Sequence, residues 1–376
     1  MIKQKSYLQS SRKIVIKIGT NLLADKVKGI NAQRLQSIAR SVAQLQLQGK
    51  QVALVSSGAI GAGVAALQLN TRPRTLAKKQ AAAAIGQPLL MEAYEHAFRK
   101  HRCVIGQILL TKEDLVDRKR FVNVRNTFAA LFEQGVVPII NENDTVAVEE
   151  IKLGDNDNLS AFVVNLIGAD LLILLSDIDG LYSDDPTKNS DATLIPIVEK
   201  ITPHIERLAR SSNTELSTGG MITKIQAAKR CVASGAAMII ANGRNPNIIE
   251  DIVAGTYVGT IFLPAGKGLN RKKKWIGFVS HAEGVIVVDE GAIEALVVKK
   301  KSLLASGIID VRGKFQKGDT VMVCDAAGRD IAKGVVRYAC DDLVRIKGKK
   351  SLEAAKILGR KNCEEVIHRD DLVVIE

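Results

Sequence analysis

The sequence predicts an α/β protein, in which helices cover both faces of a mainly parallel sheet, followed by a small, mostly β domain. Between residues 13 and 243, apolar runs rich in β-branched residues alternate with segments of helical periodicity. These runs are apolar almost throughout, which is typical of strands buried on both faces of a parallel sheet. After residue 263 the alternation gives way to short β-like runs separated by turn residues.

The elements of the first part follow one another in a regular order. A strand is predicted at KIVIKIG (13–19), a helix at 31–49 that stops at a glycine, and a second strand at QVALVSSG (51–58). An alanine-rich helical region covers about 75–100, and another helix ends at FEQG (132–135). Further strands are predicted at CVIGQILL (103–110), VVPII (136–140), DLLILLSD (170–177) and AAMIIANG (236–243). We therefore expect one three-layer sandwich over residues 1–265.

The glycine- and lysine-rich segment LPAGKGLNRKKK (263–274) marks the end of this domain. We expect a linker at 266–274 and a second domain at 275–376. Its β-like runs lie at 284–291, 318–336 and 371–375, and a short helix is predicted at 351–359.

Composition excludes several classes of protein. Aromatic residues make up 4% of the 376 residues, which argues against a base-stacking surface as the main function. No apolar run is long enough to span a membrane, and the N-terminus MIKQKSYLQSSRK has no apolar signal core. The five cysteines are widely spaced, so we expect a reducing cytoplasm and neither a zinc site nor disulfides. The net charge of +13 favours anionic partners such as nucleotides, RNA or acidic metabolites.

Two predicted strands end in residues that suit phosphate binding. Lys17 lies inside an apolar strand and is followed by Gly19, so its ammonium group would reach a phosphate at the strand end. A lysine at a sheet edge is the alternative. The second strand leads into Ser57, Gly58, Gly61 and Gly63, whose backbone N–H groups could bind an anion at a helix start. Tight packing at a strand–helix turn explains these glycines equally well.

Two further segments carry polar groups at the start of predicted helices. In STGGMITK (217–224), backbone donors and Lys224 suit a polyphosphate, although a simple helix cap is the alternative. The segment NENDTVAVEEIKLGDNDN (141–158) does not fit the calcium-loop spacing, but its carboxylates could still hold Mg²⁺. Carboxamides both donate and accept, so they could recognise a zwitterion; they are Asn141, Asn143, Asn156 and Asn158. Alone, this segment favours a solvated loop; with the other strand ends, it favours a phosphoryl-transfer site.

Six motifs in this order resemble the amino acid kinase family, and within it the glutamate 5-kinases. They are VIKIGTNLL, VSSGAIGAG, QILLT, INENDTVAVEEIKLGDNDNLSA, LLSDIDGLY and TGGMITK, over about residues 12–245. The C-terminal part resembles a PUA domain. The resemblance implies that ATP phosphorylates the side-chain carboxylate of L-glutamate to L-glutamyl 5-phosphate, the first step of proline biosynthesis, with Mg²⁺ carried by ATP.

The resemblance also implies roles for particular residues. Lys17 and Lys224 would be the catalytic lysines, and Asp157 would organise them. The substrate-binding positions would be Ser57, Gly58, Asn141, Asp144 and Asn156. The ATP-binding positions would be Lys17, Ser176, Asp177, Thr218, Gly219, Gly220, Met221, Ile222, Thr223 and Lys224. One departure is Ser217, where the family has glycine.

The resemblance implies partners as well. Proline would inhibit at the glutamate site, the chain would form dimers or tetramers, and glutamyl phosphate reductase would consume the product. RNA binding by the PUA-like domain is a separate hypothesis. The alternative functions are those of acetylglutamate kinase or aspartokinase, against which the PUA-like domain and GDNDN (154–158) argue.

Overall fold

The computed structural model describes residues 2–25, 29–69, 71, 73–146, 156–211, 220–256, 259–264, 273, 276, 282–359 and 365–375. The chain divides into two compact units, Met1–Gly268 and Leu269–Glu376. Of the predicted linker, 266–274, only Lys273 is among the described residues, so its boundaries stay a prediction.

The first unit is built on an eight-stranded sheet with the order β5-β6-β4-β1-β7-β9-β10-β8. The strands are β1 (Lys13–Ile18), β4 (Gln51–Ser56), β5 (Ile105–Leu110), β6 (Val137–Glu142), β7 (Leu171–Ser176), β8 (Ile197–Val198), β9 (Ala237–Asn242) and β10 (Thr260–Phe262). Neighbouring strands are parallel except at β9 and β10, which pair antiparallel. A mainly parallel α/β sheet was predicted, and this prediction is confirmed.

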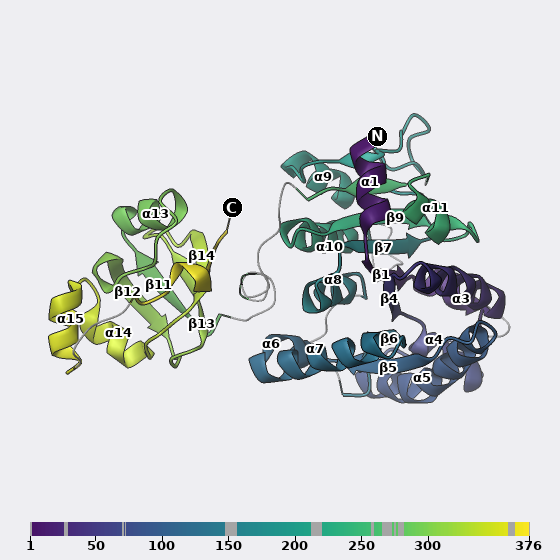
Figure 1. Ribbon diagram of the computed structural model, residues 1–376, viewed down its shortest axis with the longest axis horizontal. Coiled ribbons are helices and arrows are strands. Elements are labelled where there is room, and N and C mark those ends of the chain that lie inside the picture. Colours follow the sequence, from purple (N-terminus) through teal and green to yellow (C-terminus); the bar gives the residue numbers. More distant parts are fainter. Residues whose placement is uncertain are drawn as a thin grey trace. The chain divides into compact units, whose positions relative to one another are not determined.

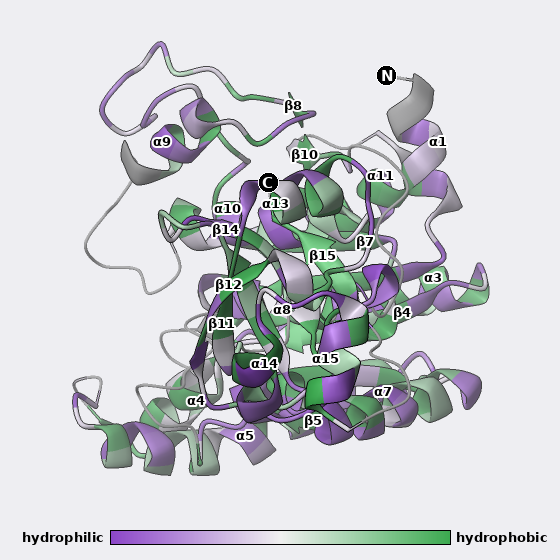
Figure 2. Cartoon of the chain, turned by 90° about the vertical axis from the view of Figure 1, so that its left-hand side faces the viewer, coloured by the Kyte–Doolittle hydropathy of each residue, from purple (hydrophilic) through white to green (hydrophobic). Residues whose placement is uncertain are grey.

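Helices cover both faces of this sheet (Figure 1). On one side lie α7 (Arg118–Glu133), α8 (Asn156–Ile167) and α10 (Met221–Ala233). On the other side lie α3 (Ala32–Leu47), α5 (Leu76–Arg99) and α11 (Ile248–Ala254). The shorter elements of this unit are α1 (Ile2–Ser10), α2 (Thr20–Leu23), β2 (Ala24–Asp25), β3 (Gly29–Ile30), α4 (Ala59–Ala66), α6 (Lys112–Val116) and α9 (Pro203–Ser211). In Figure 2 the strands are mostly hydrophobic, whereas helices such as α5 and α7 carry both kinds of residue.

The alternation of side chains along β1 sends its residues to different layers. Ile14, Ile16 and Ile18 are fully buried in the core that the sheet shares with α3, α5 and α11. Because successive side chains of a strand point to opposite faces, Lys17 points to the α8 layer. Strand β1 pairs with β4 and β7, so the alternative of a lysine at a sheet edge is wrong.

Helices α4 and α5 cross with their backbones in direct contact. A Cβ atom added to Gly63 would lie 1.8 Å from the carbonyl oxygen of Ala82, and one added to Gly86 would lie 1.8 Å from that of Ala59. Only glycine therefore permits this crossing at both positions. Gly63, considered above as part of an anion-binding loop, packs helix against helix instead.

The N-terminal helix α1 is anchored to the sheet. The hydroxyl of Tyr7 donates to the carbonyl oxygens of Asp170 (3.1 Å) and Gly235 (3.2 Å). Leu8 is buried in the same core as Ile14. Helix α1 therefore covers the sheet beside α11.

The second unit has its own five-stranded sheet, with the order β12-β11-β13-β14-β15. Its strands are β11 (Gly284–Val288), β12 (Ile308–Gly313), β13 (Thr320–Cys324), β14 (Asp330–Val335) and β15 (Leu372–Val374). Strands β11 and β13 are parallel and the other pairs antiparallel. Its helices are α13 (Glu290–Val297), α14 (Cys340–Ile346), α15 (Ser351–Ile357), η2 (Ala305–Gly307) and η3 (Arg369–Asp371). The short helix predicted at 351–359 is confirmed as α15, whereas α13 and α14 were not predicted.

Candidate active site

The carboxyl ends of the central strands are aligned by their register. Ile18, the last residue of β1, is opposite Ser56, the last residue of β4, and next to Leu175 of β7. Ser56 is followed directly by Ser57, and Ser176 ends β7 one residue beyond Leu175. Ligands of open α/β sheets bind at such ends. The residues predicted from four separate segments therefore have a common edge on which to meet.

Asp157 joins two of these segments through a buried ion-pair cluster. Its Oδ1 lies 2.7 Å from Nζ of Lys17, and its Oδ2 lies 3.1 Å from Nζ of Lys224. The hydroxyl of Thr223 donates to the same Oδ2 at 2.9 Å. Asp157 is fully buried, and the two lysines are 5% exposed each. The predicted catalytic residues thus lie together in the structure.

The two lysines determine the charge state of Asp157. Burial alone would raise its pKa, but the ammonium groups of Lys17 and Lys224 outweigh burial and lower that pKa to about 2. Asp157 is therefore ionised at neutral pH. A buried charge is costly unless it is paired, and two ammonium groups held together at the strand ends suit an anionic ligand.

Lys224 reaches the cluster because it stands in the first turn of α10. The helix begins at Met221, after the cap residue Gly220, whose carbonyl oxygen lies 2.8 Å from the hydroxyl of Thr223. Ile222 stands on the same turn and is half-buried. The predicted nucleotide residues Thr218 and Gly219, and the departure at Ser217, lie outside the described residues.

A network of side-chain amides lies beside the cluster, because Asn156 precedes Asp157 at the start of α8. Nδ2 of Asn156 donates to the carbonyl oxygen of Ser56 (2.7 Å), to Oγ of Ser57 (2.9 Å) and to Oδ1 of Asn141 (3.1 Å). The backbone N–H of Glu142 also donates to Oδ1 of Asn141, at 2.9 Å. Asn156 thus contacts two other predicted substrate-binding residues, Ser57 and Asn141.

The other two predicted substrate-binding residues flank this network. Gly58 turns the chain from β4 into α4 with a φ of 107°, a left-handed conformation that favours glycine. Asp144 lies half-buried in the turn that follows β6. Of the polar segment 141–158, residues 147–155 lie outside the described residues.

The predicted nucleotide residues Ser176 and Asp177 follow the end of β7. The hydroxyl of Ser176 donates to Asp177 at 3.2 Å, and Nδ2 of Asn21 donates to the other carboxylate oxygen at 2.8 Å. Burial would raise the pKa of Asp177, but these hydrogen bonds, with the charge of Lys224, lower it. Asp177 is therefore an ionised side chain near the lysine cluster.

Sequence reasoning missed two residues of α5 that contact the network. Nδ2 of Asn141 donates to Oε1 of Gln87 at 2.9 Å, and the fully buried hydroxyl of Tyr94 donates to Oγ of Ser56 at 2.9 Å. The only local signal for Gln87 is its place between Gly86 and Pro88, two residues that disfavour a helix interior.

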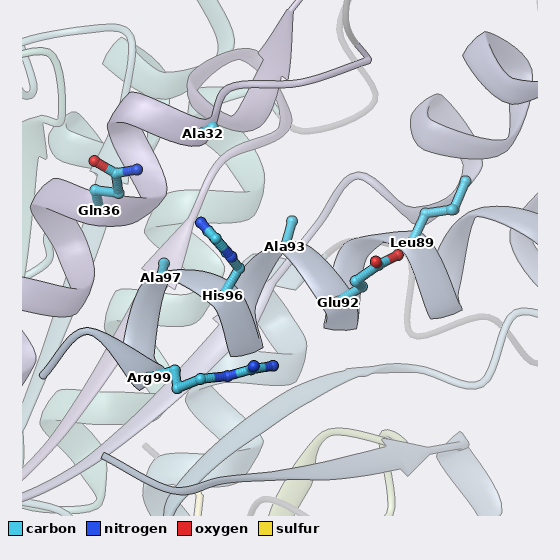
Figure 3. Close-up of a pocket in the computed structure, with 8 residues that line it drawn as sticks. All are labelled: Ala32, Gln36, Leu89, Glu92, Ala93, His96, Ala97 and Arg99. Atoms are coloured by element: carbon cyan, nitrogen blue, oxygen red, sulfur yellow. The ribbon is translucent and has the colours of Figure 1, made fainter. Parts of the chain in front are cut away.

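A surface hollow of about 310 Å³ lies between α3 and α5, in the layer on the far side of the sheet from α8 (Figure 3). None of the predicted site residues lines it. Its lining residues are Ala32, Gln36, Leu89, Glu92, Ala93, His96, Ala97 and Arg99.

Among the residues that the structure describes, no group of three or more His, Cys, Asp or Glu side chains could hold a metal ion. None of the helices they form is both long and apolar enough to cross a membrane.

Comparison with known families identifies both parts of the chain. The model of the amino acid kinase family matches residues 12–242, and that of the PUA domain matches 284–358. A protein of Geobacter sulfurreducens named glutamate 5-kinase is 49% identical over 368 residues, which are 98% of this chain and 99% of that protein. A protein of the same name from Caldanaerobacter subterraneus subsp. tengcongensis is 48% identical over 364 residues, 97% and 98% of the two chains.

Among solved structures, carbamate kinase from Giardia lamblia bound to AMP-PNP has the same fold as the first unit. Its TM-score is 0.50 at 18% identity, and the match covers 68% of this chain and 99% of that one. At this identity the likeness concerns the fold alone.

Proposed function

The chain belongs to the amino acid kinase family, and we propose that this kinase transfers the γ-phosphoryl group of ATP to the side-chain carboxylate of L-glutamate. The observation that carries the proposal is the buried cluster of Lys17, Asp157 and Lys224 beside a network of amides at the strand ends. Relatives named glutamate 5-kinase, 48–49% identical over nearly the whole chain, support glutamate as the acceptor.

The electrostatics of the reaction explain why two lysines are needed. A glutamate carboxylate is ionised at pH 7 and is already a nucleophile, so no general base is required. Its approach to the γ-phosphate brings two anions together. The ammonium groups of Lys17 and Lys224 offset this repulsion and stabilise the charge spread over the transferred phosphoryl group.

Asp157 acts as a positioning residue in this proposal. Both of its carboxylate oxygens are occupied by lysines, and it is fully buried, so its part is to hold the two ammonium groups at fixed places. Preorganised charges of this kind need no rearrangement during the reaction. The hydroxyl of Thr223 supports Asp157 from the first turn of α10.

The amide network forms part of the proposed binding site for glutamate. Nδ2 of Asn156 is used by protein acceptors, so its Oδ1 is the group left to accept a hydrogen bond from the substrate ammonium. The hydroxyl of Ser57 accepts from Asn156 and keeps its own proton for a carboxylate. The carboxylate of Asp144 suits the α-ammonium group. Gly58 and Asn141 complete this set.

The nucleotide would lie on the side of the cluster formed by α10 and the end of β7. That side carries Gly220, Thr223 and Lys224 at the start of α10, and Ser176 and Asp177 at the end of β7. We propose that Mg²⁺ arrives with ATP, because this ion usually keeps waters and shares the phosphate oxygens of the substrate. The phosphates, rather than a protein cage, would then supply its ligands, and bound Mg²⁺ would neutralise charge on the leaving group.

We place the reaction at the first step of proline biosynthesis, with proline as a competitive inhibitor at the acceptor site. The proposal is tested by incubating the protein with ATP, Mg²⁺, L-glutamate and hydroxylamine, which traps an acyl phosphate as a hydroxamate. We expect hydroxamate with glutamate but not with acetylglutamate or aspartate. Proline should raise the KM for glutamate at constant kcat. Preference for either of the other acids would contradict the proposed acceptor.

A further inference from the structure

Gln87 lies outside the predicted site, but its side chain belongs to the amide network. Oε1 of Gln87 accepts from Nδ2 of Asn141 at 2.9 Å, and Oδ1 of Asn141 accepts from Asn156 at 3.1 Å. Gln87 comes from α5, Asn141 from β6 and Asn156 from α8. The chain of amides therefore connects a helix on one face of the sheet with a helix on the other.

Backbone groups determine which atoms of these amides donate and which accept. The N–H of Glu142 can only donate, so the atom of Asn141 that meets it is the oxygen Oδ1. The carbonyl of Ser56 can only accept, so the atom of Asn156 that meets it is Nδ2. Nδ2 of Asn141 must then find its own acceptor, and Gln87 provides it. Asn141 is 3% exposed, so little water is available to replace that acceptor.

The local structure of α5 is adapted to this contact. Gly86 allows α5 to touch the backbone of α4, since a Cβ atom there would meet the carbonyl oxygen of Ala59. Pro88 lies inside the helix and removes one backbone hydrogen bond of its ladder. Glycine and proline are the least favourable residues in a helix interior, and both flank Gln87. Gln87 therefore lies between the contact of α5 with α4 and an interruption of the hydrogen-bond ladder of α5.

We infer that Gln87 is a positioning residue for the acceptor substrate: by accepting from Asn141, it holds that amide, and through it Asn156, in the orientation that binds glutamate. This inference rests on the proposed function. Gln87 touches neither lysine of the cluster, so its loss should affect binding of the acceptor more than the phosphoryl transfer. The hydrogen bond is neutral and one of several in the network, so the effect should be moderate.

The test is Gln87→Met, which keeps the length of the side chain and removes the acceptor oxygen. We expect the KM for glutamate to rise about three- to tenfold, as for the loss of one neutral hydrogen bond. The KM for ATP and kcat should stay within about twofold of the wild type, since removal of uniform binding leaves kcat unchanged. Gln36→Met on α3 is the matched control: Gln36 is half-buried, lines the hollow in Figure 3 and should leave all three constants unchanged.

A double-mutant cycle then decides whether Gln87 acts through Asn141. In an Asn141→Ala background, Gln87→Met should change the KM for glutamate by less than about twofold, because the shared hydrogen bond is already lost. Two results would overturn the inference. In one, Gln87→Met leaves the kinetic constants unchanged, as Gln36→Met does. In the other, Gln87→Met raises the KM for glutamate by the same factor with and without Asn141→Ala. Equal rises in both KM values with a lower melting temperature would also overturn it, since they indicate a general structural role. Wild-type protein without glutamate turnover would instead contradict the proposed function.

Discussion

Lys17 and Lys224 form ion pairs with the two carboxylate oxygens of Asp157, although the two lysines lie 207 residues apart in the sequence. Lys17 lies near the end of the central strand β1, and Lys224 lies in the first turn of α10. The carboxylate of Asp157 therefore holds two buried ammonium groups together at the strand ends. This relationship governs the first three predictions.

Replacing either lysine by alanine should abolish most of the activity without unfolding the protein. Removal of one preorganised charge near the transferred group commonly costs about 3–4 kcal/mol in the transition state, so kcat should fall about a hundredfold or more. Asp157 would keep one lysine partner in either variant, so the fold should persist. ADP release measures kcat, and circular dichroism checks folding.

Lys188→Ala is the control for these two changes. The side chain of Lys188 is 69% exposed and forms a surface ion pair with Asp185, at 3.4 Å. Its loss should leave kcat unchanged. Turnover like the wild type in Lys17→Ala or Lys224→Ala would rule out the proposed catalytic cluster.

Asp157→Asn should lower kcat more than it raises the KM for glutamate. The amide keeps the shape of the side chain but removes the charge that holds both ammonium groups in place. The lysines would then repel each other and lose their fixed positions, which the transition state needs more than the ground state does. Steady-state kinetics with glutamate as the varied substrate measures both constants. A pure change in KM would indicate that Asp157 binds substrate instead.

The low pKa of Asp157 makes part of the stability dependent on pH. Its folded-state pKa, about 2, is below the value of about 3.9 expected in the unfolded chain. The stabilisation is therefore present above pH 4 and is lost as the pH falls from about 4 to 2. The shift corresponds to roughly 2–3 kcal/mol. The difference in unfolding free energy between wild type and Asp157→Asn should shrink across this interval, as measured by urea denaturation. A difference that stays constant from pH 6 to pH 3 would contradict the ion-pair cluster.

Asp144→Ala and Asn156→Ala should chiefly weaken the binding of glutamate. Hydrogen bonds to charged groups contribute about 1.5–3 kcal/mol, so we expect the KM for glutamate to rise about tenfold or more. The KM for ATP serves as the internal control and should change little. A rise in the KM for ATP alone would assign these residues to the nucleotide instead.

Sequence patterns predict the sheet well because its strands are buried on both faces and read as continuous apolar runs. Lys17 was predictable for the same reason: a charged residue inside an apolar strand needs a partner. The ion pair between Lys17 and Asp157 could not be predicted from spacing, because the two residues are far apart in the sequence and only the fold brings them together. Resemblance to a family, rather than spacing, supplied that pairing.

Tertiary contacts limit what the sequence can predict about glycines and amides. Gly58 and Gly63 occur in one motif, yet Gly58 supplies a left-handed turn and Gly63 a helix crossing. Gln87 shares α5 with Gln80, and apart from its place between Gly86 and Pro88 nothing local marks it as the glutamine that contacts Asn141. Such roles depend on which helices touch, which is decided by packing.

The crossing of α4 and α5 gives the last prediction. Gly63→Ala would place a methyl group where the carbonyl oxygen of Ala82 now lies, 1.8 Å from the ideal Cβ position. The helices would have to move apart, and overpacking of this kind costs about 1–3 kcal/mol or more. Gly61→Ala is the matched control, because it lies on the same helix and its Cβ would meet nothing within 4 Å. Alanine exceeds glycine in helix propensity by about 1 kcal/mol, so Gly61→Ala should leave the stability unchanged or raise it. Urea denaturation followed by circular dichroism compares the two variants, and equal effects would show that the close approach of α4 and α5 does not constrain the fold.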